Sequence, residues 1–257
     1  MTSTLPPSPS SPAQAPVALV TGAARRVGAA IAAALHEAGY RVLIHYRQSA
    51  QAARELAARL EARRPGSTAL AQLDLLEWRR APELIEAALL RWGRLDALVN
   101  NASLFAPTAL ATASDEDWER LLGSNLRAPF ELARAAAPHL KERQGAIVNI
   151  TDIHAERPMA GYLLYSVAKA GLAQLTRALA LELAPRVRVN AVAPGPIAWP
   201  EDGQIDSAER ERILSTTPLR REGHPEQIAQ AVRYLLCDAH YVTGHTLAVD
   251  GGRSIVL

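Results

Sequence analysis

The stretch VALVTGAARRVGAAIAAALHEAGY, residues 17–40, decides the fold of this chain. It begins with apolar residues that are typical of a buried strand, and it continues into an alanine-rich run with helical periodicity. Gly22 comes directly after the strand, and Gly28 falls in the first turn of the helix. Glycines in such a turn let the backbone approach a phosphate, and the helix N-terminus offers N–H groups and a positive dipole end. The stretch therefore predicts a dinucleotide site.

Short apolar runs alternate with longer helical segments along the rest of the chain. Strands that alternate with helices form βαβ units, so we predict an α/β fold with a single Rossmann-type doubly wound parallel sheet and helices on both faces. The expected strands are residues 16–21, 41–46, 67–74, 95–100, 145–151, 187–193 and 245–250, and the expected helices are residues 27–38, 50–64, 81–92, 115–142, 162–183 and 225–236.

The domain boundaries follow from composition. Residues 1–15 are rich in Pro and Ser and carry no charged side chain, so we expect a disordered tail before one domain over residues 16–257. Residues 194–224 are rich in Pro, Gly and charge and come after a strand, which suits a loop that covers the substrate. Ligands of such sheets bind at the carboxyl ends of the strands, where the informative residues should lie.

The bulk composition narrows the class of function. The chain has 257 residues, 49% of them hydrophobic, which is enough for one sizeable core. Acids and bases are intermixed and the net charge is +2, so we expect no nucleic-acid partner. Cys237 is the single cysteine, and we expect no disulfide and no metal site. Without an apolar run of transmembrane length or a secretory signal pattern, we expect no membrane partner and a cytoplasmic protein.

The segment IHYRQSA, residues 44–50, bears on the choice of cofactor. Sites that select NAD usually place Asp or Glu after the second strand to hold the ribose hydroxyls, and this segment contains no acid. Arg47 offers a positive charge and Ser49 a hydroxyl to a 2′-phosphate, so we predict NADP(H). Ser49 can also cap the next helix, and the two uses are compatible.

Tyr165 and Lys169 are four residues apart at the start of an expected helix, which puts them on one face. The pKa of a free tyrosine is about 10, and a neighbouring ammonium favours the phenolate and lowers that pKa. The spacing is common in helices by chance. After the fifth strand of a nucleotide-binding fold, however, it indicates a catalytic proton donor.

Asp152 lies thirteen residues before Tyr165 and raises the question of which reaction needs a carboxylate there. An ionised carboxylate repels a developing alkoxide, so it suits an ordinary ketone poorly. It suits a ring C=N better, because hydride goes to carbon and the ring nitrogen must gain a proton. The alternative is that Asp152 only caps a turn in a carbonyl reductase. Thr151, one step along the strand, should point to the opposite face.

Nearly the whole chain from Pro16 resembles the short-chain dehydrogenases/reductases. TGAARRVG (21–28) is similar to their glycine turn, with Arg26 at the middle glycine position, and NNAS (100–103) departs from their Asn-Asn-Ala-Gly by Ser103. The segments VNAVAPGP (189–196) and YVTGHTLAVDGG (241–252) match as well. Most members place a serine where Asp152 stands. The residues that resemble the pteridine reductase branch are Arg26, the stretch from His45 to Ser49, Ser103, Phe105 and Asp152.

This resemblance implies NADPH-dependent reduction of a dihydropterin to the tetrahydro form by hydride transfer to a ring C=N carbon, with oxidised pterins and dihydrofolate as further substrates. It also implies a homotetramer that the last strand helps to form. The implied catalytic residues are Asp152, Tyr165, Lys169 and Asn125, the last supporting the lysine through a water. The implied substrate-binding residues are Arg26, Ser103, Phe105, Asp152, Tyr165 and Trp199. The implied cofactor-binding residues are Gly22, Arg26, Val27, Gly28, Tyr46, Arg47, Ser49, Asp74, Leu75, Asn101, Ala102, Ser103, Tyr165, Lys169, Pro194 and Gly195.

Several roles have a plainer alternative. Arg26 can pair with the pyrophosphate or with a ligand beside it, and Asp74 can contact adenine or cap a helix. Phe105 can sandwich a pterin against the nicotinamide or plug the core, where we expect Phe130. Trp199 can wall the substrate site or pack within its loop.

Two rival functions stay open. The first is a carbonyl reductase of the same fold, for example for 3-oxoacyl thioesters. The second is a non-catalytic NADP-sensing protein, against which the intact set of Tyr165, Lys169 and Asn125 argues.

Overall fold

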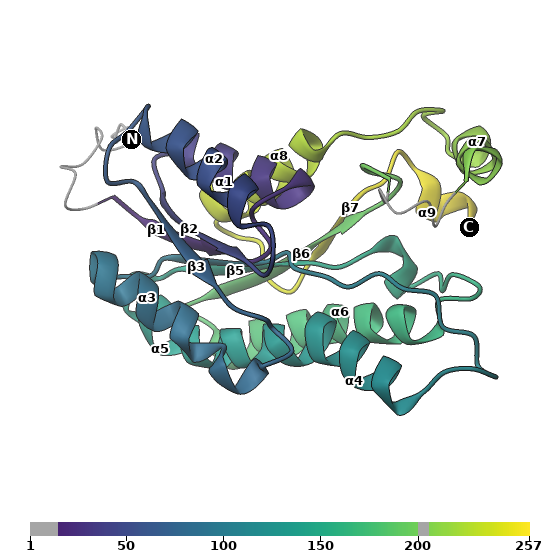
Figure 1. Cartoon of the computed structure of the whole chain (residues 1–257), viewed down its shortest axis with the longest axis horizontal. Coiled ribbons are helices and arrows are strands. Elements are labelled where there is room, and N and C mark those ends of the chain that lie inside the picture. Colours follow the sequence, from purple (N-terminus) through teal and green to yellow (C-terminus); the bar gives the residue numbers. More distant parts are fainter. Residues whose placement is uncertain (1–14, 200–205) are drawn as a thin grey trace, which may run out of the picture.

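The computed structural model describes residues 15–199 and 206–257, and the expected tail lies outside them apart from residue 15. These residues contain a seven-stranded sheet in which every paired strand is parallel, in the order β3-β2-β1-β4-β5-β6-β7 (Figure 1). The predicted Rossmann-type fold is therefore confirmed. The strands are β1 (Val17–Val20), β2 (Arg41–Tyr46), β3 (Thr68–Gln72), β4 (Ala97–Asn100), β5 (Ala146–Ile150), β6 (Arg188–Pro194) and β7 (Thr246–Val249).

Helices cover both faces of the sheet (Figure 1). One core joins alternate strand residues such as Ala18 and Val20 to α1, α2 and α8, and the other joins Val17 and Leu19 to α3, α5 and α6. Because both faces are buried, the strands read as continuous apolar runs in the sequence. The helices are α1 (Arg26–Glu37), α2 (Ala50–Glu61), α3 (Pro82–Trp92), α4 (Asp115–Leu122), α5 (Ala128–Arg143), α6 (Leu163–Leu183), α7 (Ser207–Thr216), α8 (Pro225–Cys237) and α9 (Arg253–Val256).

The strand order reverses between β1 and β4, which are neighbours in the sheet. The chain leaves β1 toward β2 and leaves β4 toward β5, which lie in opposite directions along the sheet. A crevice therefore opens beyond the carboxyl ends of β1 and β4. The sequence motifs after β1, β2, β4, β5 and β6 all reach this edge.

The segment expected as one helix over residues 115–142 is divided. A π-helical turn, η3 (Gly123–Arg127), separates α4 from α5, and the Ala128 N–H bonds to the Gly123 carbonyl. Pro129 follows, and it has no N–H to give the Asn125 carbonyl in a regular α-helix. The proline explains why the α-helical pattern does not continue through Asn125.

Residues 194–224 contain a helix that the sequence reading missed. Helix α7 begins after Asp206, whose carboxylate accepts a hydrogen bond from the Glu209 N–H. Most side chains of α7 are polar or charged, so its apolar periodicity is weak. The composition of the segment suggested a loop, but the cap and the Glu209–Arg212 ion pair favour a helix.

The expectation that Phe130 is part of the core is wrong for the single chain. The side chain is 37% exposed, and its ring lies 5.7 Å from the Arg127 guanidinium. Among the described residues, no helix combines the length and apolar character that crossing a membrane requires.

Candidate active site

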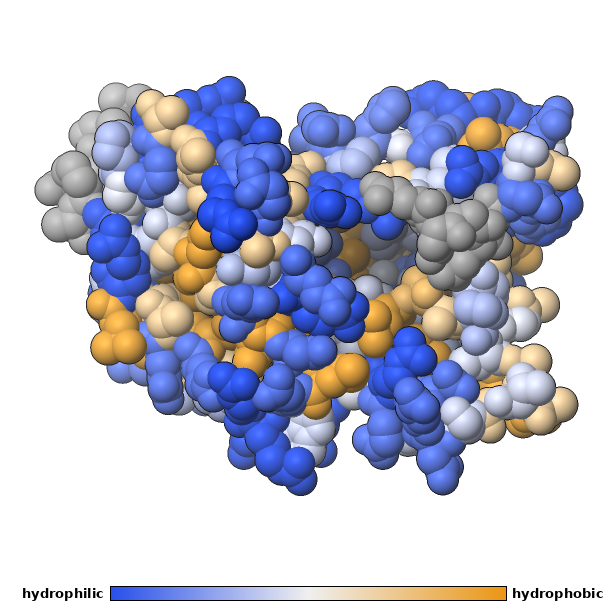
Figure 2. All heavy atoms as spheres, viewed as in Figure 1, coloured by the Kyte–Doolittle hydropathy of each residue, from blue (hydrophilic) through white to orange (hydrophobic). Residues whose placement is uncertain are grey.

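A cavity of about 820 Å³ opens at the carboxyl ends of the strands. The space-filling view shows the molecular surface hollowed near the middle of the face it presents (Figure 2). Every residue predicted from the sequence to bind cofactor or substrate, or to act in catalysis, lines this cavity except Asn125. The predicted cofactor-binding residues Val27, Tyr46 and Leu75 are among those that line it.

The glycine turn after β1 is tightly built. Gly22 has φ +60°, and a Cβ on Gly28 would lie 2.1 Å from the Gly22 carbonyl oxygen, so a side chain at Gly28 would not fit. The Asn101 amide donates to the carbonyls of Thr21 and Gly22 at 2.8 and 3.2 Å. The backbone of this turn borders the cavity at the N-terminus of α1. Such a position is suited to binding a phosphate of a dinucleotide.

His45 supports the turn in a way the sequence reading missed. Its Nδ1 accepts the Gly22 N–H at 3.0 Å and its Nε2 donates to the Leu73 carbonyl at 3.0 Å, which makes the ring neutral. Burial lowers the pKa of His45, in agreement with the neutral form. The sequence feature that could have indicated this role is a histidine near the end of an apolar strand, beside the expected position of the glycine turn.

The residues after β2 and β3 leave polar groups on the cavity wall. Ser49 occupies the N-cap position of α2, but its side chain makes no capping hydrogen bond. Arg47 lies 3.9 Å from Asp74, and both side chains are more than a third exposed. Asp74 also accepts the Leu76 N–H at 3.0 Å, which agrees with a local capping role and leaves the adenine contact a prediction. The hydroxyl of Ser49 and the cation of Arg47 are suited to a 2′-phosphate.

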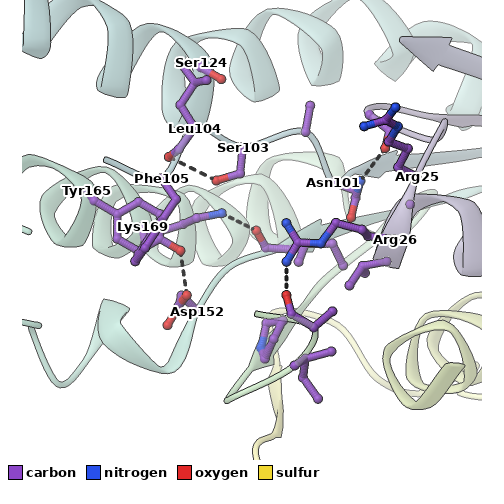
Figure 3. Close-up of a pocket in the computed structure, with 18 of the residues that line it drawn as sticks. Arg25, Arg26, Asn101, Ser103, Leu104, Phe105, Ser124, Asp152, Tyr165 and Lys169 are labelled. Carbon is purple, nitrogen blue, oxygen red and sulfur yellow. Dashed lines mark hydrogen bonds between the residues drawn. The ribbon is translucent and has the colours of Figure 1, made fainter. Parts of the chain in front are cut away.

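Arg26 bridges the two sides of the cavity. Its backbone is left-handed, with φ +51°, and its guanidinium donates to the carbonyl of Ala198 in the segment after β6 (Figure 3). The contact ties the cofactor turn to the predicted substrate segment, and both predicted partners of Arg26, pyrophosphate and ligand, stay predictions. The neighbouring Arg25 is exposed and also borders the cavity.

Asn125 is buried within η3, and its side chain acts on the loop after β4 rather than on the cavity. Its amide oxygen accepts the Leu104 N–H and its amide nitrogen donates to the Leu104 carbonyl, both at 2.8 Å. This clamp fixes the loop that carries Ser103 and Phe105. The water-mediated support of Lys169 stays a prediction.

Phe105 lies at the cavity within an aromatic cluster. Its ring stacks on Tyr162, with centroids 4.5 Å apart, and meets Tyr165 edge-on at 4.8 Å. Tyr162 and Tyr165 together hold the Phe105 ring in place beside the cavity. Tyr162 lies at the N-cap position of α6 and was not singled out from the sequence.

Asp152, Tyr165 and Lys169 come together at the centre of the cavity (Figure 3). The Tyr165 hydroxyl donates to Asp152 Oδ2 at 2.6 Å, and Asp152 Oδ1 accepts the His154 N–H at 2.8 Å. Lys169 Nζ donates to the Ile150 carbonyl at 2.8 Å. Asp152 therefore caps a turn, as the alternative held, and also holds the tyrosine hydroxyl.

The expected depression of the tyrosine pKa by Lys169 is wrong for this arrangement. Burial and the Asp152 carboxylate raise the pKa of Tyr165 well above its ordinary value. Burial lowers the pKa of Lys169 to about 8, against a smaller opposite effect of Asp152. The ammonium lies 5.8 Å from the centre of the tyrosine ring, whereas the carboxylate accepts the hydroxyl hydrogen directly. Tyr165 is therefore poised as a neutral proton donor.

The remaining sequence predictions concern the strand ends beside this centre. Thr151 is buried and its hydroxyl donates to the Val192 carbonyl at 3.1 Å, but the residue also borders the cavity, so the expected separation from it is not seen. Gly195 packs so closely on Asp250 that an added Cβ would lie 2.6 Å from the Asp250 Cα. Trp199 lines the cavity, with the Arg210 guanidinium 5.6 Å from its ring.

The comparisons with known proteins agree with this geometry. The sequence profile of the enoyl-(acyl carrier protein) reductase family, part of the short-chain dehydrogenases/reductases, matches residues 22–254. The chain belongs to the short-chain dehydrogenase/reductase family. It is thus an oxidoreductase of a family that works with nicotinamide cofactors, which favours an enzyme over a sensor.

Three curated relatives of this short-chain dehydrogenase/reductase illustrate two of the activities that occur among its relatives' names. A protein named pteridine reductase 1, from Leishmania tarentolae, is 39% identical over 94% of this chain and 97% of its own length. A protein named 3-oxoacyl-[acyl-carrier-protein] reductase, from Synechocystis, is 40% identical over 93% of this chain and 96% of its own. A protein with the same name from Staphylococcus epidermidis is 35% identical over 91% and 97%. Identity alone does not separate the two activities.

The lowered pKa of Lys169 predicts a pH-dependent stability. Between pH 8 and 10.5 the unfolded chain keeps the proton that the folded protein has released, so the free energy of unfolding rises with pH. A shift of this size corresponds to about 3 kcal/mol. We expect urea titrations to show this rise in wild type relative to Lys169→Met. The control is Lys141→Met, at the chain's other lysine, which is exposed. Parallel pH profiles of wild type and Lys169→Met would contradict the assignment.

Proposed function

We propose that the protein catalyses NADPH-dependent reduction of pterins, from the dihydro to the tetrahydro form, with oxidised pterins and dihydrofolate as further candidate substrates. The observation that carries the proposal is the hydrogen bond of 2.6 Å between the Tyr165 hydroxyl and Asp152. A carboxylate at the reacting centre suits a ring C=N, whose nitrogen must gain a proton, better than a ketone, whose oxygen becomes an alkoxide.

The Asp152–Tyr165 pair has the groups for this proton transfer. Each carboxylate oxygen of Asp152 accepts one hydrogen bond and keeps a lone pair, with which it can hold the amino edge of a pterin ring. Tyr165 keeps its proton because its pKa is raised, and Asp152 can return a proton to it from solvent. The pair can thus donate to a ring nitrogen without forming a buried phenolate.

Aromatic and cationic groups around the pair support a flat, polar ligand. Phe105 brings an aromatic ring to the cavity wall, and Tyr162 stacks on that ring and fixes it. Arg26 and Ser103 border the same cavity and provide hydrogen-bond donors. Trp199, on the segment after β6, completes the proposed pterin wall.

A bound nicotinamide cofactor would supply the hydride for this reaction. The cavity provides the glycine turn for its pyrophosphate, and Pro194, Gly195 and Lys169 line the same cavity. Arg47 and Ser49, with no acid in the segment after β2, favour NADP(H) over NAD(H).

The cofactor proposal predicts a selective loss of NADPH affinity. We expect Arg47→Ala to raise the Kd for NADPH by about 10- to 100-fold, the range of a lost charge-assisted hydrogen bond, and to leave the Kd for NADH nearly unchanged. The measurement is fluorescence titration of both cofactors. Arg54→Ala is the control, because Arg54 is exposed on α2 and does not line the cavity. Equal affinity of wild type for NADH and NADPH would sink the proposal.

The pterin proposal predicts that Asp152 is required for turnover. We expect Asp152→Ser to lower kcat/KM for dihydrobiopterin, dihydromonapterin or dihydrofolate by about 10²-fold or more, the usual contribution of a proton-transfer group. NADPH oxidation with each pterin is the assay. Glu156→Gln is the matched control, since this exposed acid lies four residues away and outside the cavity.

The second candidate function is reduction of 3-oxoacyl thioesters, which the names of the cyanobacterial and staphylococcal relatives favour. The same assay with a 3-oxoacyl thioester separates the two functions. Turnover of the thioester but of no pterin would establish the second candidate and would leave Asp152 as a turn cap.

We also propose a homotetramer in the cytoplasm, as the resemblance to the family and the sequence composition imply. Several apolar side chains on α4, α5 and α6 support an association surface, since Trp118, Phe130, Leu163 and Val167 are each at least 37% exposed in the single chain. Sedimentation velocity should give a particle of four chains, and a monomer would contradict the proposal. Fractionation of cells would test the location.

A further inference from the structure

Arg253 is a buried cation on the cavity wall that the proposed reaction does not use. It is the first residue of α9, directly after the turn Gly251–Gly252, and only 6% of it is exposed. It lines the cavity together with Ile213 of α7 and Trp199. In Figure 1, α9 lies beside α7 at the end of the molecule where the segment after β6 also lies.

The guanidinium of Arg253 is only partly satisfied. Its Nη1 donates to the Ile213 carbonyl at 3.1 Å and to Thr216 Oγ1 at 2.9 Å. Within residues 15–199 and 206–257, neither Nε nor Nη2 has a hydrogen-bond partner. Arginine presents these nitrogens as a planar fork that matches a carboxylate or a phosphate.

No acid in the described part of the chain neutralises this charge within ion-pair distance. Glu209 of α7 adds attraction, but it is paired with Arg212 at 2.6 Å, and the positive charge of Arg212 offsets it. The carbonyl end of α7 carries only a partial negative charge. Burying a cation that has no counter-charge among residues 15–199 and 206–257 is costly, and a neutral donor would anchor α7 equally well. The arrangement is therefore suited to an anion that arrives from the cavity.

The cofactor phosphates are poor candidates for this anion. Arg253 follows β7, which is four strands from β1 in the sheet, or about 19 Å at the usual strand spacing. The pyrophosphate turn follows β1 and the proposed 2′-phosphate groups follow β2. A substrate bound at the Asp152–Tyr165 pair shares the cavity with Arg253.

We propose that Arg253 is a specificity-determining residue that binds an anionic group, a carboxylate or a phosphate, on the side chain of the substrate. The inference rests on the proposed function, because it takes the ring of that substrate to be a pterin. It predicts that the protein prefers pterins with a charged side chain over those with a neutral one.

The test compares substrates and variants. Dihydrofolate supplies carboxylates and dihydroneopterin phosphate supplies a phosphate, whereas dihydrobiopterin and dihydromonapterin are neutral in the side chain. We expect Arg253→Met to raise KM for the anionic substrates by about 10- to 100-fold, with KM for the neutral pterins and for NADPH changed less than about twofold. The anionic substrate whose KM rises more in Arg253→Met identifies the bound group as a carboxylate or a phosphate. Arg253→Lys keeps the charge and should retain part of the preference.

Thr216→Val is the matched control, because it removes one anchor of Arg253 to α7 and leaves the cation in place. If Arg253 only anchors α7, Arg253→Met will raise KM for neutral and anionic pterins alike, as Thr216→Val would, and the proposal is overturned. Equal KM values of wild type for neutral and anionic pterins would also overturn it.

A binding measurement separates this inference from the proposed function. If wild type reduces no pterin, the proposed function fails, and calorimetric titration of folate and of inorganic phosphate onto the NADP⁺-saturated protein decides the role of Arg253. Binding of either probe that is lost in Arg253→Met supports an anion site. Equal binding to wild type and Arg253→Met, or no binding of either probe to wild type, overturns it.

Discussion

Hydrogen bonds between the ends of β1 and β4 hold the floor of the cavity. The Thr21 hydroxyl donates to the Val99 carbonyl and accepts the N–H groups of Asn101 and Ala102 at 2.9 and 3.0 Å. The Asn101 amide in turn holds the carbonyls of the glycine turn. The cofactor turn and the loop that carries Phe105 both leave from this junction, which is the point where the strand order reverses. Their relative position is therefore set by the sheet.

A second set of buried polar groups places the reacting centre against that floor. Asn100 donates to Asn149 at 2.8 Å, and Asn149 donates to Thr176 of α6 at 2.9 Å, so β4, β5 and α6 are joined through side chains in the core. Helix α6 carries Tyr165 and Lys169, and β5 leads into Asp152. The tyrosine hydroxyl thus meets the carboxylate because three elements are fixed to one another, and burial of the pair raises the pKa of Tyr165.

The charges around the cavity divide into two groups with different partners. Arg26 is satisfied by the backbone of the segment after β6, and Arg47 lies in partial solvent beside Asp74. Lys169 and Arg253 are buried, and burial lowers the pKa of each. Buried cations with few protein partners point to ligands. Desolvating a charge costs free energy, and a neutral donor could anchor the same elements without that cost.

The sequence by itself determined the parallel α/β fold, the strand and most helix positions, the glycine turn and many of the residues around the cavity, because periodicity and strand-end motifs are local patterns. It missed α7, whose side chains lack an apolar stripe, and the π-helical turn at Asn125. Only the tertiary structure decided which groups pair. The Tyr165 hydroxyl bonds Asp152 rather than responding to Lys169, Asn125 clamps Leu104, His45 holds Gly22, and Arg253 reaches the cavity from the last helix. These contacts join residues that are distant in the chain, and hydrogen-bond geometry and burial, which set them, exist only once the elements have packed.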